Sequence, residues 1–186
     1  MAAHKHRYAR VGYLRWPNPD MLVPVTPWTD RSPVVAAMLN PALLATIIAT
    51  AAEEYERADH DPMPWPLAFL VAPLVLHRDT RDALPNSTRS HLATWVSNHP
   101  TLRAGLPARA RSLAPSVQEG LRFGMEAGVL AVVDDGRLRS SLRIARQPPD
   151  VGDLRALVRS SGLVGKWFAK LDQPATAFAL LGVAPG

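Results

Sequence analysis

The stretch VLAVVDDGRLRSSLRI (residues 129–144) decides the predicted fold. Its first five residues are apolar and rich in β-branched side chains, and the tripeptide DDG (residues 134–136) is typical of a tight turn. We therefore expect a β-hairpin over residues 129–144. Arg137, Arg139 and Arg143 occupy alternate positions of its second strand, so their side chains are expected on one face of the hairpin.

The remaining sequence has the apolar spacing of helices. Asn40 before Pro41 is a helix start, because a capping side chain precedes a proline at the first helical position, and Ser32 before Pro33 repeats the pattern. Glycines at 162 and 165 are expected to weaken a helix in its middle. Helices are expected from residue 33 and over residues 41–57, 65–76, 87–98, 101–127, 151–171 and 175–181, with either a polar turn or a short helix at 77–83.

These elements predict a mainly helical fold with a winged helix-turn-helix-like domain. Helices followed by a two-stranded hairpin have the element order of that domain, here over about residues 66–144, with the wing at about 129–144. The long helix at 101–127 is an addition to the minimal version. We expect a single domain over residues 32–186, with its C-terminal helices at about 151–181. Residues 1–31 combine prolines with aromatic side chains and are expected to form an arm, either a flexible tail or a segment that becomes ordered on a partner.

The composition excludes several kinds of site. The 186 residues include no cysteine, which excludes a disulfide scaffold, a zinc ribbon, an iron–sulfur site and a thiol nucleophile, and fits a reducing cytoplasm. The longest apolar run, residues 65–76, is about half of what a membrane-spanning helix needs. No secretory signal precedes it. We therefore expect a cytoplasmic protein without a membrane partner.

The sequence also lacks the motifs of common catalytic sites. No histidine pair has the spacing of a zinc hydrolase, and neither a Gly-x-Ser-x-Gly elbow nor a glycine-rich phosphate loop occurs. We expect no enzyme activity, no cofactor and no metal. A hydrolase is the most distant alternative, and it would lose its activity through one histidine or aspartate substitution that leaves the fold intact.

The net charge of +5 has its basic excess in residues 78–186. Arg89 and His91 begin the helix predicted at 87–98, and in a winged helix this helix and the wing with Arg137, Arg139 and Arg143 approach DNA. The five residues are therefore candidates for contact with nucleic acid or with an acidic partner. The alternative is a solvated face in which the hairpin arginines offset the aspartates of the turn.

Two further groups have open interpretations. Three glutamates, at positions 53, 54 and 56, lie at the C-terminal end of the helix at 41–57, where the helix dipole disfavours negative charge, so we expect either a nearby cation or a solvated end. Trp167, Phe168 and Phe178 form an aromatic cluster near the C-terminus. Such a cluster belongs either to the core or to a protein interface, where aromatic anchors dominate.

Four segments resemble the middle component of three-component ABC systems. They are NPALLATIIATAAEEY (40–55), PLAFLVAPLVLHRDTRDALPNSTRSHLATWVSNHP (66–100), RARSLAPSVQEGLRFGMEAGVL (109–130) and GKWFAKLDQPATAFALLGVAP (165–185). The segments are collinear and cover most of the chain from residue 32 onward. Residues 1–31 and 137–162 match no pattern.

The resemblance implies a non-catalytic accessory subunit that works beside an SMC-like ABC ATPase and an effector subunit in bacterial defence against phages or plasmids. In Lamassu-type systems, which are related, the ATPase is proposed to sense foreign DNA ends. The middle component would be a winged-helix scaffold that bridges the other subunits and contacts double-stranded DNA. A free-standing winged-helix DNA-binding regulator is the alternative.

The resembling segments are largely apolar, with two polar patches as exceptions. His77, Arg78 and Arg81, together with Thr80, form the first patch. The second consists of residues 87–89. Helix caps and salt bridges account for both patches, and contacts at a protein interface are the sharper hypothesis.

Overall fold

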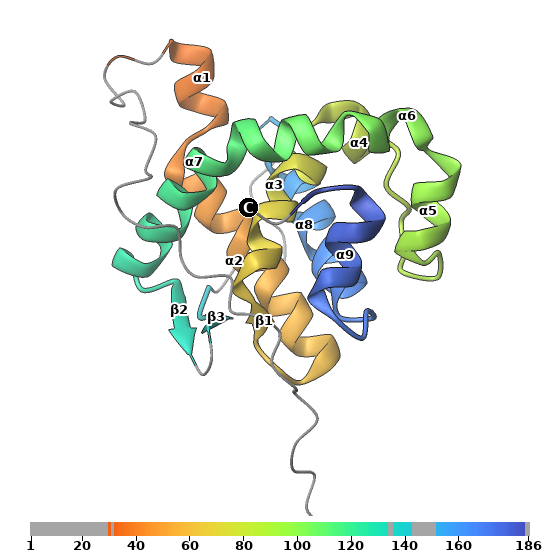
Figure 1. Cartoon of the computed structure of the whole chain (residues 1–186). Helices are drawn as coiled ribbons and strands as arrows, with labels where there is room; N and C mark the ends of the chain where they lie inside the picture. The colour runs from red at the N-terminus through yellow and green to blue at the C-terminus, as the bar shows by residue number, and fades with distance from the viewer. Residues whose placement is uncertain (1–29, 31, 134–135, 143–151, 185–186) are drawn as a thin grey trace, which may run out of the picture.

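The computed structural model describes residues 30, 32–133, 136–142 and 152–184. It is mainly helical with one small antiparallel sheet (Figure 1). The elements are α1 (Pro33–Met38), α2 (Pro41–Asp59), β1 (Met63–Pro64), the 3-10 helix η3 (Trp65–Leu67), α3 (Ala68–Val75), α4 (Arg78–Asp82), α5 (Leu92–Asn98), α6 (Pro100–Ala104), α7 (Leu106–Glu126), β2 (Leu130–Val133), β3 (Arg137–Ser140), α8 (Leu154–Phe168) and α9 (Pro174–Leu181). The predicted arm lies outside the described residues except for Asp30.

Helix α2 is the centre of the fold. Its start follows the predicted pattern, because Ala42 donates its backbone N–H to Asn40 Oδ1 at 2.8 Å and Pro41 occupies the first helical position. The helix ends at His60, whose φ of 68° is left-handed. Helices α3, α7 and α8 and strand β3 all pack against it, and nine of its 19 residues are buried.

The helical stretch Val35–Asp59 is long and apolar enough to cross a membrane by length and composition alone, with a mean hydropathy of 1.8. Asn40, Thr46 and Thr50 interrupt this stretch, so it is not one continuous apolar run in the sequence. In the fold, 47% of its most apolar window is buried inside the protein. The core helix of a soluble protein passes the same test.

Glycines allow α7 and α8 to approach α2 closely. A Cβ atom at Gly165 would lie 2.1 Å from the backbone oxygen of Ala51, and one at Gly120 would lie 2.6 Å from Leu44 Cβ. Real Cβ atoms do not approach other heavy atoms so closely. The glycines at 162 and 165 were expected to weaken their helix, but the structure buries both of them where α8 crosses α2.

The predicted hairpin is present in the described residues. Strands β2 and β3 pair antiparallel from Leu130 opposite Ser140 to Val133 opposite Arg137. Strand β1 adds to the other side of β3 through Met63 opposite Leu138, which gives the sheet order β1-β3-β2. Residues 134–135 and 143–144 of the predicted hairpin lie outside the described residues.

The mainly helical class with a hairpin is confirmed, whereas the winged-helix arrangement stays a prediction. The helix that leads directly into β2 is α7, and α5 is separated from the hairpin by α6 and α7.

The helix expected at 101–127 is two helices, α6 and α7, because the chain turns at Gly105 and Pro107 lies near the start of α7. Arg109 of α7 connects the two helices, because its Nη2 donates to the Leu102 carbonyl of α6 at 2.9 Å. Burial lowers the pKa of its guanidinium, and the charge of Asp79 opposes that shift.

We expect Gly165→Ala to reduce the free energy of unfolding by about 3 kcal/mol or more, because the added methyl group meets backbone that cannot rotate away. Gly162→Ala in the same helix is the control. Its Cβ would lie 3.2 Å from Glu54 Cγ, a flexible side chain, so a change within about 1 kcal/mol is expected. Urea unfolding measures both, and equal costs would contradict the close contact of α8 with α2.

Candidate interaction surfaces

The hairpin arginines are held by the C-terminal end of α2 and the segment that follows it. Arg139 Nε donates to Glu56 Oε1 at 3.0 Å. Arg137 donates from Nη1 to the Pro62 carbonyl at 2.9 Å, and Asp61 Oδ2 lies 3.9 Å from the same nitrogen. Both side chains thus have partners within the chain, and a phosphate would compete with those partners. Arg143 lies outside the described residues.

Cations surround the acidic end of α2, as one of the two interpretations expected. Arg57 pairs with Glu53 at 2.7 Å and also with Glu54. Lys166 of α8 places Nζ 2.9 Å from Glu54 Oε2. With Arg139 on Glu56, each of the three glutamates has a basic partner. These charges offset the unfavourable position of the carboxylates at the negative end of the helix dipole.

Arg89 and His91 do not join the hairpin arginines in one surface. Both are exposed and lie just before α5 or at its N-terminal cap. Figure 1 shows α5 and the β2–β3 hairpin on opposite sides of the molecule. The helix next to the hairpin, α7, exposes Arg122 and Phe123, the latter 41% accessible. Sequence reasoning missed these two residues, although the position of their helix directly before the hairpin was a usable signal.

The aromatic cluster belongs to the core. Trp167 and Phe168 are each 1% exposed, and Phe178 is 8% exposed. Trp167 Nε1 donates to the Ser90 carbonyl at 2.7 Å, and its ring lies 5.8 Å from that of Trp95. Of the two interpretations, the structure therefore places the three side chains in the core and not on the surface.

The first polar patch contains a helix cap and a surface ion pair. His77 caps α4, since the Thr80 backbone N–H donates to His77 Nδ1 at 3.2 Å. Arg78 pairs with Asp82 one turn later at 3.6 Å, and both side chains are well exposed. These contacts match the interpretation of the patch as caps and salt bridges.

Arg81, the third residue of that patch, is buried. Its Nη1 donates to the Val75 carbonyl at 3.1 Å, and its Nη2 donates to Asp153 Oδ2 at 2.6 Å. Only 7% of the Arg81 side chain is exposed, against 67% for Asp153. The pair connects α4 to the residue that precedes α8, so it fixes two elements 72 positions apart in the sequence.

Ser87 and Thr88 of the second patch join Arg81 in a polar cleft of about 630 Å³. We call this hollow the polar cleft; α2, the segment between α4 and α5, and α8 form its walls. The segment is held in place because Lys170 Nζ donates to the Thr88 carbonyl at 2.6 Å. The cleft is lined by Thr50, Glu54, Arg81, Asp82, Leu84, Pro85, Asn86, Ser87, Thr88, Ala156, Val158, Arg159, Ser160, Gly162, Leu163 and Lys166.

Arg159 is the most available charged group in the polar cleft. It is exposed on α8 and has no ion-pair or hydrogen-bond partner within the part of the chain that the structure describes. By contrast, Arg81 and Lys166 are paired with Asp153 and Glu54. The cleft is therefore suited to polar contacts with another chain.

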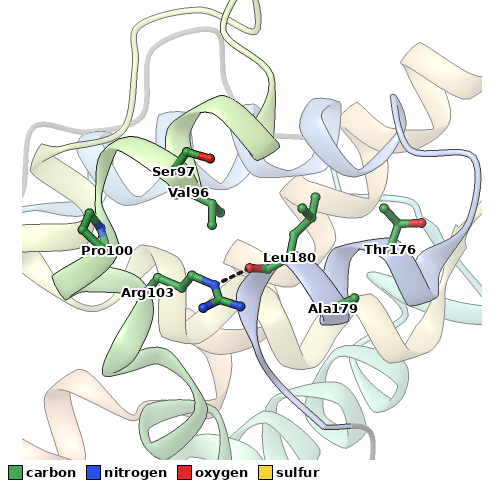
Figure 2. Close-up of a pocket in the computed structure, with 7 residues that line it drawn as sticks. All are labelled: Val96, Ser97, Pro100, Arg103, Thr176, Ala179 and Leu180. Atoms are coloured by element: carbon green, nitrogen blue, oxygen red, sulfur yellow. Dashed lines mark hydrogen bonds between the residues drawn. The ribbon is translucent and has the colours of Figure 1, made fainter.

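A second hollow lies between α5, α6 and α9 (Figure 2). This α5–α9 groove is an open surface hollow with a volume of about 500 Å³. It shares no lining residue with the polar cleft. The groove is lined by Val96, Ser97, Pro100, Arg103, Thr176, Ala179 and Leu180. Among the residues that the structure describes, no group of three or more histidine, aspartate or glutamate side chains could hold a metal ion.

We expect Asp153→Asn to destabilise the protein by about 1–2 kcal/mol, because it leaves the buried Arg81 guanidinium without its counter-charge. The cost is moderate because Asp153 itself is largely exposed, so solvent screens the pair. Asp82→Asn, which removes the exposed partner of Arg78, is the control and should cost less than about 0.5 kcal/mol. Thermal unfolding at low and high salt compares them, and equal effects would show that the Arg81 pair is not a structural connection.

Comparison with known proteins identifies the chain. The family model described as ABC-three component (ABC-3C) system Middle Component 3 matches residues 28–185. No curated protein and no solved structure gives a match. The matched range includes every described helix and strand, the polar cleft and the α5–α9 groove. The chain therefore belongs to the family of Middle Component 3 proteins of ABC-three component systems.

Proposed function

We propose that this protein is a non-catalytic accessory subunit that joins an SMC-like ABC ATPase to an effector subunit in defence against phages or plasmids. The family match over residues 28–185 carries the proposal, because a middle component of a three-component system works with other subunits. The SMC-like, Lamassu-type character of the ATPase follows from the resemblance of the four sequence segments. The proposed compartment is the cytoplasm.

The surface supports a bridging role through two hollows of different chemistry. The polar cleft offers Arg159, hydroxyl groups and carboxylates, whereas the α5–α9 groove is mostly apolar with one arginine. The two hollows share no lining residue, so two partners could bind without competing for the same side chains. The polar cleft includes members of both polar patches that the sequence singled out.

We also propose that the protein contacts double-stranded DNA. The hairpin arginines already bind Glu56 and the Asp61–Pro62 segment, so DNA contact by Arg139 would exchange a carboxylate for a phosphate. Such an exchange gains less than the neutralisation of a phosphate by an unpaired arginine. We therefore assign DNA contact to the assembled complex and not to the isolated subunit.

The first test is co-purification of the tagged protein with the ATPase encoded beside it, at moderate and at high salt. The proposal predicts a stable complex at moderate salt. Arg159→Glu is expected to weaken capture of a partner at least about tenfold, because it reverses the available charge of the polar cleft. Arg111→Glu, an exposed charge reversal on α7 outside both hollows, is the matched control. Purification without any partner at either salt concentration would refute the accessory role.

DNA binding separates the proposal from the alternative of a free-standing regulator. We expect the isolated protein to bind duplex DNA with a dissociation constant of about 10⁻⁵ M or weaker at physiological salt, in the non-specific range. Fluorescence anisotropy over a salt series measures it. Tight, salt-sensitive binding that Arg89→Ala or joint substitution of Arg137 and Arg139 reduces would favour the regulator.

A further inference from the structure

The exposed side chain of Arg103 lines the α5–α9 groove, and one hydrogen bond orients its guanidinium. Its Nε donates to the Leu180 carbonyl at 2.7 Å, as Figure 2 shows. That carbonyl belongs to the last turn of α9, where the helix supplies no partner. Within the described residues, the one hydrogen bond of the Arg103 side chain is that from Nε, and neither Nη atom has a hydrogen-bond or ion-pair partner. The side chain is therefore held by one nitrogen, and its other two nitrogens remain donors.

Four of the other six lining residues of the groove are apolar. Val96 and Pro100 line one side, and Ala179 and Leu180 of α9 line the other. In Figure 2 the Arg103 guanidinium lies between Val96 and Pro100 on one side and the residues of α9 on the other. An occupant must therefore place an apolar group and an acceptor for the guanidinium close to each other. Two hydroxyl groups, from Ser97 and Thr176, also line the hollow.

We propose that the α5–α9 groove binds the C-terminal residue of a partner polypeptide. A C-terminal residue with an apolar side chain carries that side chain and a carboxylate on the same Cα atom. The carboxylate would accept from the Nη groups of Arg103, a bidentate geometry that guanidinium favours. The side chain would lie against Val96 and Leu180. The assignment of this polypeptide to a partner subunit rests on the proposed function. The binding of a carboxylate with an apolar side chain is inferred from the groove alone.

The charge of the groove favours a single carboxylate over a nucleic acid. Binding a polynucleotide requires several cations along its phosphates. Arg103 is the one charged residue among the groove's lining residues in the described part of the chain. The single guanidinium can bind one carboxylate, and the apolar lining residues can contact one apolar group beside it.

The direct test uses acetyl-Ala-Leu with a free carboxylate and the same peptide as its C-terminal amide, added to methyl-labelled full-length protein. We expect the free acid to shift the methyl resonances of Val96, Ala179 and Leu180, and the amide to bind at least about tenfold more weakly, because it lacks the charge-assisted hydrogen bonds. Equal shifts from both peptides, or no shift from the free acid, would overturn the proposal.

Two variants place the binding at Arg103. Arg103→Gln should abolish the shifts, but it also removes the contact with the Leu180 carbonyl and could disturb α9. Ala179→Glu avoids that difficulty, because it leaves Arg103 in place and offers the guanidinium a competing carboxylate from an exposed position in the groove. Ala175→Glu, exposed on the same helix but outside the groove, is the matched control and should bind the free acid like the wild type. Undiminished binding by Ala179→Glu would contradict the site.

The complex tests the biological occupant separately. If the wild-type complex forms and Ala179→Glu, but not Ala175→Glu, loses one subunit, the groove is a subunit-binding site. If both variants assemble like the wild type, the partner assignment of the groove is wrong while the accessory function stands. If the wild-type protein binds the free acid but assembles with no partner, the accessory function fails and the carboxylate site stands.

Discussion

The crossing of α8 over α2 is the constraint on which the rest of the structure depends. Gly165 lies against the backbone of Ala51 at a distance that no side chain could occupy. Because the two helices meet so closely, Trp167 and Phe168 at the end of α8 reach the core. The same approach brings Lys166 to Glu54, so one contact fixes both an apolar and an ionic part of the fold.

The polar cleft depends on that crossing. Trp167 and Lys170, which follow Gly165 in sequence, donate to the Ser90 and Thr88 carbonyls and hold the segment between α4 and α5 over α8. Arg81 holds the start of α8 from the other side through Asp153. The cleft is thus a consequence of how α8 is packed, and its polar lining comes from segments far apart in the chain.

Several charged side chains pair with each other within the fold and are therefore less available to partners. The acidic end of α2 receives Arg57, Lys166 and Arg139 from its own helix, from α8 and from the hairpin. This arrangement relieves the helix dipole and orients the hairpin. Arg103 and Arg159, which have donors without a partner among the described residues, lie elsewhere, each beside one of the two hollows described above.

The sequence by itself determined the local elements and the family, because apolar spacing, proline caps and turn residues act over a few positions. It located α2 and the hairpin and the recurring family segments. Only the tertiary structure decided that Trp167 is core, that Arg139 binds Glu56, and that Arg103 reaches α9, since each contact joins residues more than 70 positions apart. Long-range packing also changes the effect of Gly165 on stability. Glycine destabilises an isolated helix, but here it is necessary because α8 packs so closely against α2.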